Sequence, residues 1–488
     1  MPCVNPDLSA DLCARLREAF LTAGYTADGV VALLGRHAHA ALGRGEPEPA
    51  RRASREAGPL GTLIRLFLLG EAEPERAVRA ALGPLDLDEA VAAEILTPDL
   101  RAGLDIRPYE DNWWVVADLD SDVRGGPVRP DHVLGVGHAS VSLARATARR
   151  PVDTLLDLGT GCGVQVLHAS SHARRITATD LSPRALALAR GTVHLNELDV
   201  ELLRGEWFDP VGERRFDQIV CNPPFVVGPA RVDYVYRDAG LAGDGASELV
   251  VRRMPDHLTE GGVGQLLASW LHRRGEDWAD RVDSWLPRGV DAWFVQRDVA
   301  DPALYVGTWL RDAGIDPRSP EGRAQADAWL DWFAANDVEG VGFGYVTLRR
   351  TDETPTRVVC EDLRHAYDDP LGPETARWLD NVAWLRGNEG ELASTRFTVP
   401  PTVLLEEVHE PAETGWASLV RRLHRTDGPG WQHEVDEPTA RLVAGCRGEL
   451  PLEDLLTLLE LAYGELDRSA ALPVVRDLVL HGMLVPSP

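Results

Sequence analysis

The chain has 488 residues, 44% of them hydrophobic, which is enough to build several folded domains with cores of their own. Its 50 basic residues are all arginine and stand against 77 acidic residues, which gives a net charge of −27. No third of the chain is basic, and residues 351–488 carry 12 arginines against 25 acids. Because proteins that hold a phosphate backbone normally show a basic patch, this balance argues against nucleic acid as the main partner.

The sequence predicts a cytoplasmic protein without a metal site or disulfides. No apolar run reaches the length of about 18 residues that spans a membrane. The first twenty residues contain acids where a secretory signal would be basic and then apolar. The cysteines form no CxxC pair and have no regular spacing, unlike a zinc site or a disulfide framework. They are Cys3, Cys13, Cys162, Cys221, Cys360 and Cys446.

Residues 1–100 predict a helical accessory domain. Leucine, alanine and phenylalanine recur every three to four residues in several segments that Gly, Pro or Asp separate. The expected helices are 8–22, 27–41, 60–70 and 75–82. Residues 104–119 then read as two strands around a turn at 110–112. Helices followed by a hairpin indicate a small helical or winged-helix-like domain.

Residues 101–350 alternate strand and helix patterns, which favours an α/β fold with a parallel sheet covered on both faces. The expected strands lie near 154–158, 175–179, 200–203, 216–221, 263–269, 290–297 and 339–349. Helices are expected after each of the first five of these strands. Residues 301–336 carry five aromatic side chains, which either border a substrate cleft or, as we favour, pack a helical pair onto the sheet. These are Tyr305, Trp309, Trp329, Trp332 and Phe333.

A glycine-rich loop follows the first of these strands, in the sequence LLDLGTGCGV. Gly159, Gly161 and Gly163 allow the backbone to approach a ligand closely, because glycine carries no Cβ. Asp157 before the loop and Asp180 after the next strand offer carboxylates to a nucleoside. The pattern indicates a cofactor that contains a ribose, and this loop alone would also suit NAD.

The strand at 216–221 ends at Asn222-Pro223-Pro224-Phe225. The prolines fix φ and lack an N–H, so the strand stops and Asn222 lies at the carboxyl edge of the sheet. An asparagine oxygen and the Pro223 carbonyl can each accept a hydrogen bond from an NH2 group, while Phe225 can lie against a planar face. This motif suits a planar amide or an exocyclic base amine, and NAD binding would leave it without a role.

In this order, the motifs resemble those of the class I S-adenosylmethionine-dependent methyltransferases, over roughly residues 131–349. The matching segments are Asp157–Gly163, Thr179–Pro183, Arg204–Phe208 and Asn222–Phe225. The resemblance implies a Rossmann-like, seven-stranded methyltransferase sheet and S-adenosyl-L-methionine as the cofactor. It implies cofactor contacts from Asp157, Gly159, Thr160, Gly161, Gly163, Asp180, Glu206, Trp207 and Asn222. It implies catalytic roles for Asn222, Pro223, Pro224 and Phe225.

Two substrate classes remain open within this resemblance. The acidic charge and the segment Gly243–Gly245 favour a protein glutamine, as in HemK/PrmC-like enzymes, with a release-factor-like or ribosomal protein as partner. Phe225 in place of tyrosine and the flanking domains favour a base of ribosomal RNA, as in RsmC-like guanine-N2 or adenine-N6 enzymes. The chain departs from both patterns, with Arg129–Ser140 where HemK enzymes have Pro-Arg-x-Glu-Thr-Glu and with Val226 where RsmC-like enzymes have histidine. A noncatalytic cofactor sensor is a third reading, which an intact NPPF motif disfavours.

The segment after the NPPF motif is rich in glycine and predicts a flexible lid. It carries Asp233, Tyr234, Tyr236 and Arg237. Residues 351–488 are expected to form an acidic C-terminal domain. Its last part, residues 437–488, predicts three helices and a short strand, a pattern similar to winged-helix modules. Because the region is acidic, we interpret it as a protein-contact or substrate-positioning module and not as a DNA reader.

Overall fold

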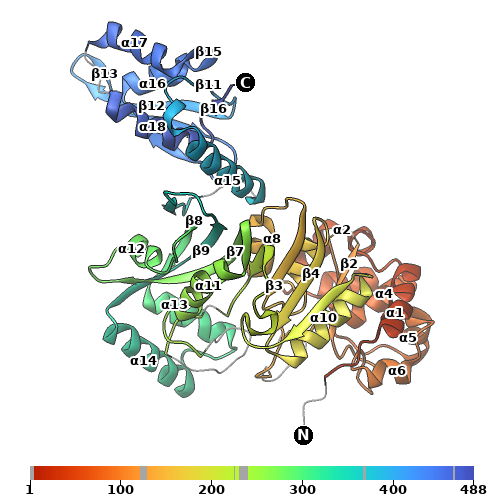
Figure 1. Ribbon diagram of the computed structural model, residues 1–488. Helices are drawn as coiled ribbons and strands as arrows, with labels where there is room; N and C mark the ends of the chain where they lie inside the picture. The colour runs from red at the N-terminus through yellow and green to blue at the C-terminus, as the bar shows by residue number, and fades with distance from the viewer. Residues whose placement is uncertain are drawn as a thin grey trace. The chain divides into compact units, whose positions relative to one another are not determined.

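The computed structural model describes residues 5–110, 112–120, 129–224, 226–229, 240–365, 370–464 and 468–487 (Figure 1). The chain divides into two compact units. The first unit contains residues 1–144 and 151–362, and the second contains residues 145–150 and 363–488. The N-terminal helices and the central sheet therefore belong to one unit.

An eight-stranded sheet forms the centre of the first unit, in the order β10-β8-β9-β7-β6-β3-β4-β5. The seven strands predicted from the sequence are confirmed, and β9 alone runs antiparallel to both of its neighbours. The strands are β3 (Val152–Leu158), β4 (Ala173–Asp180), β5 (Val200–Arg204), β6 (Phe216–Cys221), β7 (Leu258–Arg273), β8 (Val290–Ala300), β9 (Val338–Arg350) and β10 (Val358–Asp362). The prediction of seven strands missed β10, a short edge strand that pairs in parallel with β8.

The sheet has its topological switch at β3, because β4 pairs on one side of β3 and β6 on the other. Ligands of open α/β sheets bind at such a switch, outside the carboxyl ends of the strands. Helices α9 (Val164–Ala169), α10 (Pro183–Leu195), α11 (Gly245–Arg253) and α12 (Trp278–Asp283) follow β3, β4, β6 and β7. The carboxyl ends of β3, β4 and β6 thus define the place for a site.

The helix expected after β5 is wrong. Residues 205–215 connect β5 to β6 and contain only the 3₁₀ turn η2 (Asp209–Val211). This connection is too short for a helix that must return to the start of the next strand, and Pro210 lacks the N–H that a longer helix would use. A second 3₁₀ turn, η3 (Met254–His257), follows α11 and leads into β7.

The N-terminal part of the first unit consists of short helices and a hairpin. Its elements are α1 (Ala10–Ala23), α2 (Ala27–Leu42), α3 (Glu48–Ser54), α4 (Gly58–Leu63), the π-helical turn η1 (Ile64–Leu68), α5 (Glu75–Leu82), α6 (Leu87–Ala92), β1 (Asp105–Tyr109) and β2 (Trp113–Ala117). The hairpin prediction is confirmed, whereas α3 and α6 were not predicted and the helix expected at 60–70 ends in a π turn.

This N-terminal part shares a hydrophobic core with α10, which Figure 1 shows beside β2 and α1. The N–H of Val116 donates to the Thr192 hydroxyl over 3.0 Å, and Asn196 Nδ2 donates to the Trp114 carbonyl over 2.7 Å. The N-terminal part therefore holds α10, the helix that begins three residues after Asp180.

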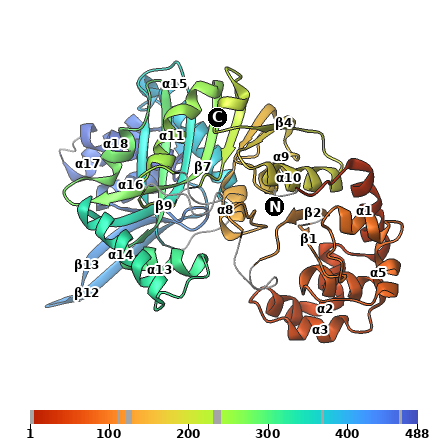
Figure 2. The same cartoon turned by 90° about the horizontal axis from the view of Figure 1, so that it is seen from below.

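Helices α13 (Pro302–Asp312) and α14 (Pro320–Ala335) follow β8 and precede β9 in the chain, and Figure 2 shows them beside β9. Their aromatic residues form a separate cluster with Leu271, Val341 and Phe343 of the sheet. Tyr305 and Phe333 are each 1% exposed. The favoured prediction of a helical pair packed on the sheet is confirmed, and none of the five aromatic residues lines the cavity described below.

The second unit combines helices with two three-stranded sheets, in the orders β15-β11-β16 and β12-β13-β14. The three helices and final strand predicted for residues 437–488 are confirmed, whereas the β12–β14 sheet was not predicted. The elements are α15 (Gly372–Gly387), η4 (Glu389–Glu391), β11 (Arg396–Thr398), β12 (Val403–Ala412), β13 (Gly415–Arg425), β14 (Gln432–Glu434), α16 (Glu437–Gly445), β15 (Arg447–Pro451), α17 (Leu452–Tyr463), α18 (Arg468–Leu480) and β16 (Val485–Pro486).

Candidate functional site

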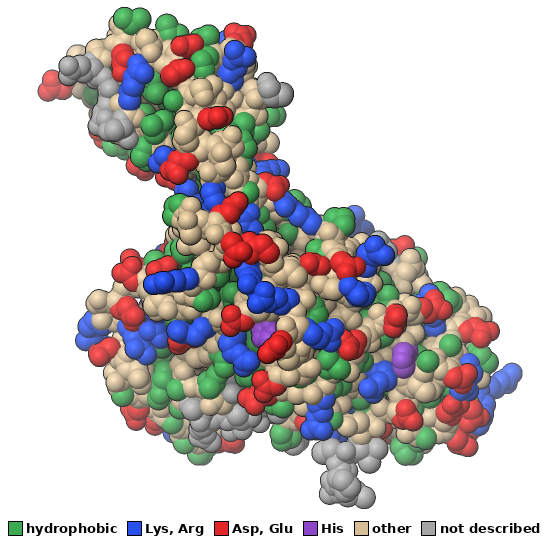
Figure 3. Space-filling model, viewed as in Figure 1, with side chains coloured by type: hydrophobic (Ala, Val, Ile, Leu, Met, Phe, Trp, Pro, Cys, Tyr) green, Lys and Arg blue, Asp and Glu red, His purple; other side chains and the backbone are tan. Residues whose placement is uncertain are grey.

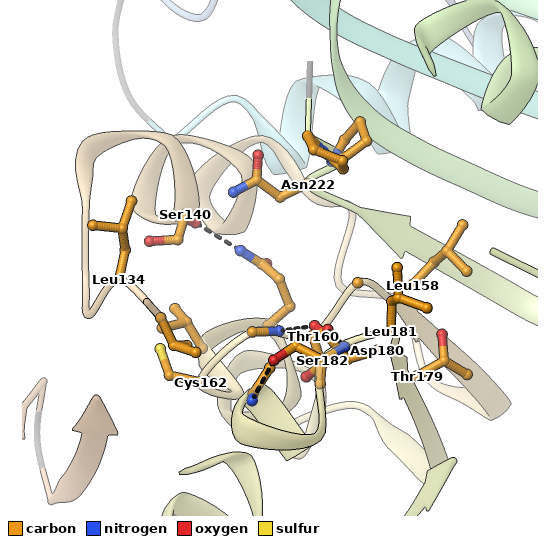
Figure 4. A pocket seen from close by; sticks show the side chains of 18 of the residues that line it. Leu134, Ser140, Leu158, Thr160, Cys162, Thr179, Asp180, Leu181, Ser182 and Asn222 are labelled. Carbon is orange, nitrogen blue, oxygen red and sulfur yellow. Dashed lines mark hydrogen bonds between the residues drawn. The ribbon is translucent and has the colours of Figure 1, made fainter. Parts of the chain in front are cut away.

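A cavity of about 320 Å³ lies at the carboxyl ends of β3, β4 and β6 (Figure 4). The glycine loop, the start of α10 and the turn after β6 form its walls together with residues 131–140, which lead into α8 (His138–Ala146). Figure 4 shows Asn222 and Asp180 on different sides of this space. The cavity therefore brings together motifs that are 42 positions apart in the sequence.

At Gly159 and Gly161 the glycine loop presents backbone to the cavity. Gly159 and Gly161 have φ values of +77° and +56°, and no atom lies within 4 Å of the position that a Cβ would take at either. The N–H groups of Gly159 and Thr160 donate to the Thr179 carbonyl over 3.0 and 2.9 Å, which fastens the loop to the end of β4. A ligand can approach this backbone closely because nothing else fills the space.

Asp180 lines the cavity at the end of β4. One carboxylate oxygen accepts from the Gly161 N–H over 2.9 Å, and the other accepts from the Ser182 N–H over 2.8 Å. Burial raises the pKa of Asp180, while these backbone donors oppose that rise. Each oxygen keeps a further lone pair, so the carboxylate can also accept from two neighbouring hydroxyl groups.

Asp157 and Gly163 do not line the cavity, in contrast to the other expected cofactor contacts. Asp157 is 1% exposed, and its Oδ2 accepts from the Thr160 hydroxyl over 2.6 Å. Burial raises the pKa of Asp157 to about 7, the Thr160 bond opposes this, and the charge of Asp180 adds to it. Gly163 precedes α9 with a φ of +87°. Both residues therefore support the loop from beneath.

Glu206 and Trp207 line the cavity beyond β5, as the resemblance implies. The Gly205 N–H donates to the Asp180 carbonyl over 3.1 Å, so this turn is joined to the end of β4. Trp207 has a φ of +47° and packs on the hydrophobic cluster beneath the sheet, while Glu206 remains exposed. A planar ring in the cavity would meet a polar and an aromatic side chain here.

Asn222 lies at the end of β6, and Pro223 and Pro224 continue the cavity wall. The Asn222 Oδ1 atom is buried and has no hydrogen-bond partner among the residues that the structure describes. A buried acceptor without a partner costs roughly 1–3 kcal/mol, so such an atom calls for a donor from a ligand. Phe225 and the expected lid residues Asp233, Tyr234, Tyr236 and Arg237 lie outside the described residues.

Residues 131–140 form a wall that the sequence analysis did not assign to the site. The wall includes Asp131, His132, Val133, Leu134, Gly135, Gly137, Ala139 and Ser140. The Val133 N–H donates to Asp118 over 2.9 Å, and Asp118 forms a buried ion pair with Arg184 of α10. Gln165 Nε2 donates to the Ser140 carbonyl over 2.8 Å. Two glycines, at 135 and 137, just before α8 were the signal that could have identified this wall.

The segment Gly243–Gly245, which the sequence analysis compared with HemK enzymes, has a structural role. Asp244 is buried, accepts from the Leu271 N–H over 2.9 Å and pairs with Arg281 at 2.7 Å. It thereby fixes the start of α11 to β7 and α12. Among the described residues, no group of three or more His, Cys, Asp or Glu side chains is placed to hold a metal ion. In the same residues, no helix is both long and apolar enough to cross a membrane.

Comparison with known proteins agrees with this geometry. Residues 135–261 match the methyltransferase small domain. A release factor glutamine methyltransferase from Bordetella pertussis is 40% identical over 194 residues, which are 37% of this chain and 68% of that protein. The chain belongs to the class I S-adenosylmethionine-dependent methyltransferase family.

Other relatives carry similar names. A ribosomal protein uL3 glutamine methyltransferase from Bradyrhizobium diazoefficiens is 35% identical over 150 residues, which are 28% of this chain and 46% of that protein. The chain spans about half the length of other curated relatives that it matches. The crystal structure of the Thermus 16S rRNA methyltransferase RsmC, solved with AdoMet and guanosine, has a TM-score of 0.27 at 20% identity and covers 37% of this chain and 44% of that chain.

The regions outside the methyltransferase small domain match two other families. Residues 22–106 match a domain of unknown function, DUF7059, and residues 376–486 match another, DUF7782. The first of these regions contains helices α2 to α6, and the second contains most of the second unit.

Proposed function

We propose that this chain transfers a methyl group from S-adenosylmethionine to the side-chain nitrogen of a glutamine in a protein. The buried Asn222 Oδ1 carries this proposal, because it lies in the cavity wall and has no hydrogen-bond partner among the described residues. An acceptor in this position suits an incoming NH2 group. Asp180, Glu206 and the glycine loop line the same cavity and suit the nucleoside end of the cofactor.

The residues present fit S-adenosylmethionine. The backbone at Gly159 and Gly161 is open toward the space that a ligand would fill. Asp180 would hold the ribose hydroxyls, and Glu206 and Trp207 would contact the adenine edge and face. Leu158, Cys162 and Leu181 add apolar surface to the same cavity. S-adenosylmethionine, when bound, supplies a methyl group that its sulfonium already makes reactive.

The protein's task is then to position the acceptor nitrogen and to exclude water. In our proposal, Asn222 Oδ1 accepts one N–H of the acceptor amide, and the Pro223 carbonyl accepts the other. Two hydrogen bonds in the plane of the NH2 group fix the nitrogen so that its lone pair faces the methyl group. The acceptor nitrogen would form its bond to the methyl carbon as the sulfur–methyl bond breaks, the sulfur would keep the electron pair of that bond as a neutral thioether, and the nitrogen would then release one proton to solvent. Because alignment supplies most of the rate, the site needs no strong general base during transfer.

A protein glutamine is favoured over a nucleobase by the relatives and by charge. Relatives that match the methyltransferase region include proteins named release factor or uL3 glutamine methyltransferases. The chain carries a charge of −27, and Figure 3 shows arginines interspersed with acids on the face in view. A surface of this kind gives little of the salt-sensitive attraction on which nucleic-acid binding depends.

The test is transfer of radiolabelled methyl from S-adenosylmethionine into a lysate by the purified chain. We expect label in protease-sensitive material, and N5-methylglutamine after complete enzymatic digestion to amino acids. Asn222→Ala, in the same lysate, should give almost none. Label in nuclease-sensitive material would overturn the glutamine proposal and favour the ribosomal RNA alternative. If no label enters protein or nucleic acid in several lysates, the result would favour a noncatalytic cofactor sensor.

A further inference from the structure

We propose that the hairpin of β12 and β13, residues 403–425, is a docking arm for an extended, basic segment of a protein. This proposal rests on the proposed function in one respect only, since it takes the docked protein to be the methylation substrate. Nothing in the methyl-transfer site contributes to the arm, which belongs entirely to the second unit. The name arm is used below for residues 403–425.

The arm is a long hairpin that other strands cover only at its base. β12 and β13 pair from Val403 and Arg425 to Ala412 and Gly415. The third strand, β14, pairs only with residues 422–424 of β13. Every residue from 407 to 419 is exposed. Figure 2 shows the two arrows running side by side to the end of the hairpin.

The arm exposes large apolar side chains. Trp416 near the tip is 72% exposed, and Leu419 is 58% exposed. Leu404, Leu405 and Val408 of β12 are also exposed. A two-stranded hairpin is only marginally stable in water, and one with so much apolar surface gains stability when a partner covers it. This apolar surface therefore points to a binding role.

The backbone of the arm can also accept a new strand. In the sheet order β12-β13-β14, β12 is an edge strand along its whole length. Edge strands present unpaired N–H and C=O groups, and extended peptides often bind by adding a strand to such an edge. An extended segment can thus pair with β12 and place alternate side chains over Leu404 and Val408.

The charges on the arm indicate that the docked segment of the partner is basic. At the base of the arm, Glu407 pairs with Arg421 at 2.6 Å, and Glu406 pairs with Arg422. Toward the tip, Glu410 and Glu413 have no ion-pair partner among the described residues, and no arginine lies between residues 408 and 420. Arginine side chains of a partner can pair with these acids, and one can lie over the exposed face of Trp416.

The same charges disfavour other occupants. The two unpaired acids at the tip repel the phosphates of RNA and of anionic lipid. Residues 145–150 and 363–488, which form the second unit, carry 21 acids against 14 arginines, so the unit as a whole repels such ligands. A second copy of the chain would bring an equally acidic tip. The occupant that matches both the apolar surface and the charge is a basic polypeptide.

The test uses the full chain and a fluorescent 12-residue peptide in which arginine alternates with valine. We expect this peptide to bind, and a peptide with glutamate in place of arginine not to bind. The double variants Trp416→Ala with Leu419→Ser, and Glu410→Gln with Glu413→Gln, should each weaken binding tenfold or more. Leu461→Ser on α17, where Leu461 is 81% exposed, and Glu449→Gln are the matched controls and should bind normally. Equal affinity in the arm variants and the controls would overturn the proposal.

Two further measurements separate the arm from the methyl-transfer site. The arm variants should bind S-adenosylmethionine as the unmodified chain does, yet transfer less label to protein at low substrate concentration. Unchanged transfer at low substrate concentration would refute docking of the substrate by the arm and leave the proposed reaction standing. If the arm binds the peptide but the chain methylates no glutamine, the proposed reaction is refuted and peptide docking by the arm stands. Arm-dependent binding of single-stranded RNA, or arm-dependent dimerisation in sedimentation, would also overturn the docking proposal.

Discussion

The N–H of Val227 donates to the phenol oxygen of Tyr305 over 2.6 Å. This bond ties the chain just beyond Asn222–Pro224 to helix α13. Tyr305 is fully buried, and its ring stacks on Phe343 of β9 with 5.7 Å between the ring centres. The helical pair between β8 and β9 therefore supports the turn that we propose to hold the methyl acceptor, although it lies outside the cavity.

Tyr305→Phe should lower turnover while leaving cofactor affinity unchanged. The variant keeps the ring packing but leaves the buried Val227 N–H without its acceptor, at a cost of roughly 1–3 kcal/mol. We expect kcat to fall about tenfold because small displacements of the acceptor are costly in positioning. Steady-state kinetics and calorimetry with S-adenosylmethionine provide the measurement. Tyr463→Phe, which removes a hydroxyl bonded to Glu437 in the second unit, is the control. An unchanged kcat in Tyr305→Phe would show that the bond has no role in positioning.

Asn222→Ala tests the acceptor site itself. Because its Oδ1 has no hydrogen-bond partner among the described residues, truncation removes the proposed contact to the acceptor and breaks no bond from Oδ1 to those residues. Turnover should fall by roughly two powers of ten or more, the scale of lost positioning, with cofactor affinity nearly unchanged. Single-turnover methyl transfer and cofactor titration together provide the readout. A variant whose turnover falls only in step with its cofactor affinity would contradict this role.

The sequence predicted strands such as β3, β6 and β8 well because each contains an apolar run that ends at a polar signal. Asp180 and Asn222 could be placed at one edge of the sheet for the same reason, since parallel strands share their carboxyl ends. Asp157 shows the limit of such reasoning, because its motif position does not reveal that it lies beneath the cavity. The wall at 131–140 was missed since it depends on the long-range pair of Asp118 and Arg184.

The arm was missed for a different physical reason. Strand β12 has the sequence VLLEEVHEPA, which lacks the strict alternation of a half-buried strand because most of both faces is exposed. Short strands such as β10 and β11 have a related difficulty, since their pairing partners are distant in the sequence. The local sequence predicts a helix or strand only where burial of one face makes apolar residues recur at a regular spacing.

Asp180→Ala should weaken cofactor binding strongly. The variant removes the acceptor proposed for the ribose hydroxyls and also frees the Gly161 and Ser182 N–H groups. We expect micromolar affinity for S-adenosylmethionine in the unmodified chain, on the order of −8 kcal/mol, and a loss of at least about tenfold in the variant. Calorimetry measures both values. Asp199→Ala, at an exposed position after α10, is the control. Binding of NAD by the unmodified chain, with no heat from S-adenosylmethionine, would contradict the assignment of the cofactor.

The buried Asp157 should make the first unit less stable as the pH rises. Burial raises its pKa to about 7, whereas an aspartate in the unfolded chain has a pKa of about 3.9. The folded chain thus holds a proton that the unfolded chain has released between these two values. Since stability falls with pH wherever the folded state binds more protons, this contribution is complete below about pH 4 and is lost as the pH rises through about 7.

Asp157→Asn cannot release this proton, so the variant should lose less stability than the unmodified chain between pH 5 and pH 8. The measurement is the unfolding midpoint of both proteins at the two pH values without cofactor, followed by a signal from the first unit because the two units need not unfold together. Asp153→Asn, at an exposed position on β3, is the control for the general effect of charge. Asparagine can still accept the hydrogen bond from Thr160, so the loop should keep its shape. Parallel pH profiles for Asp157→Asn and the unmodified chain would contradict a raised pKa at this residue.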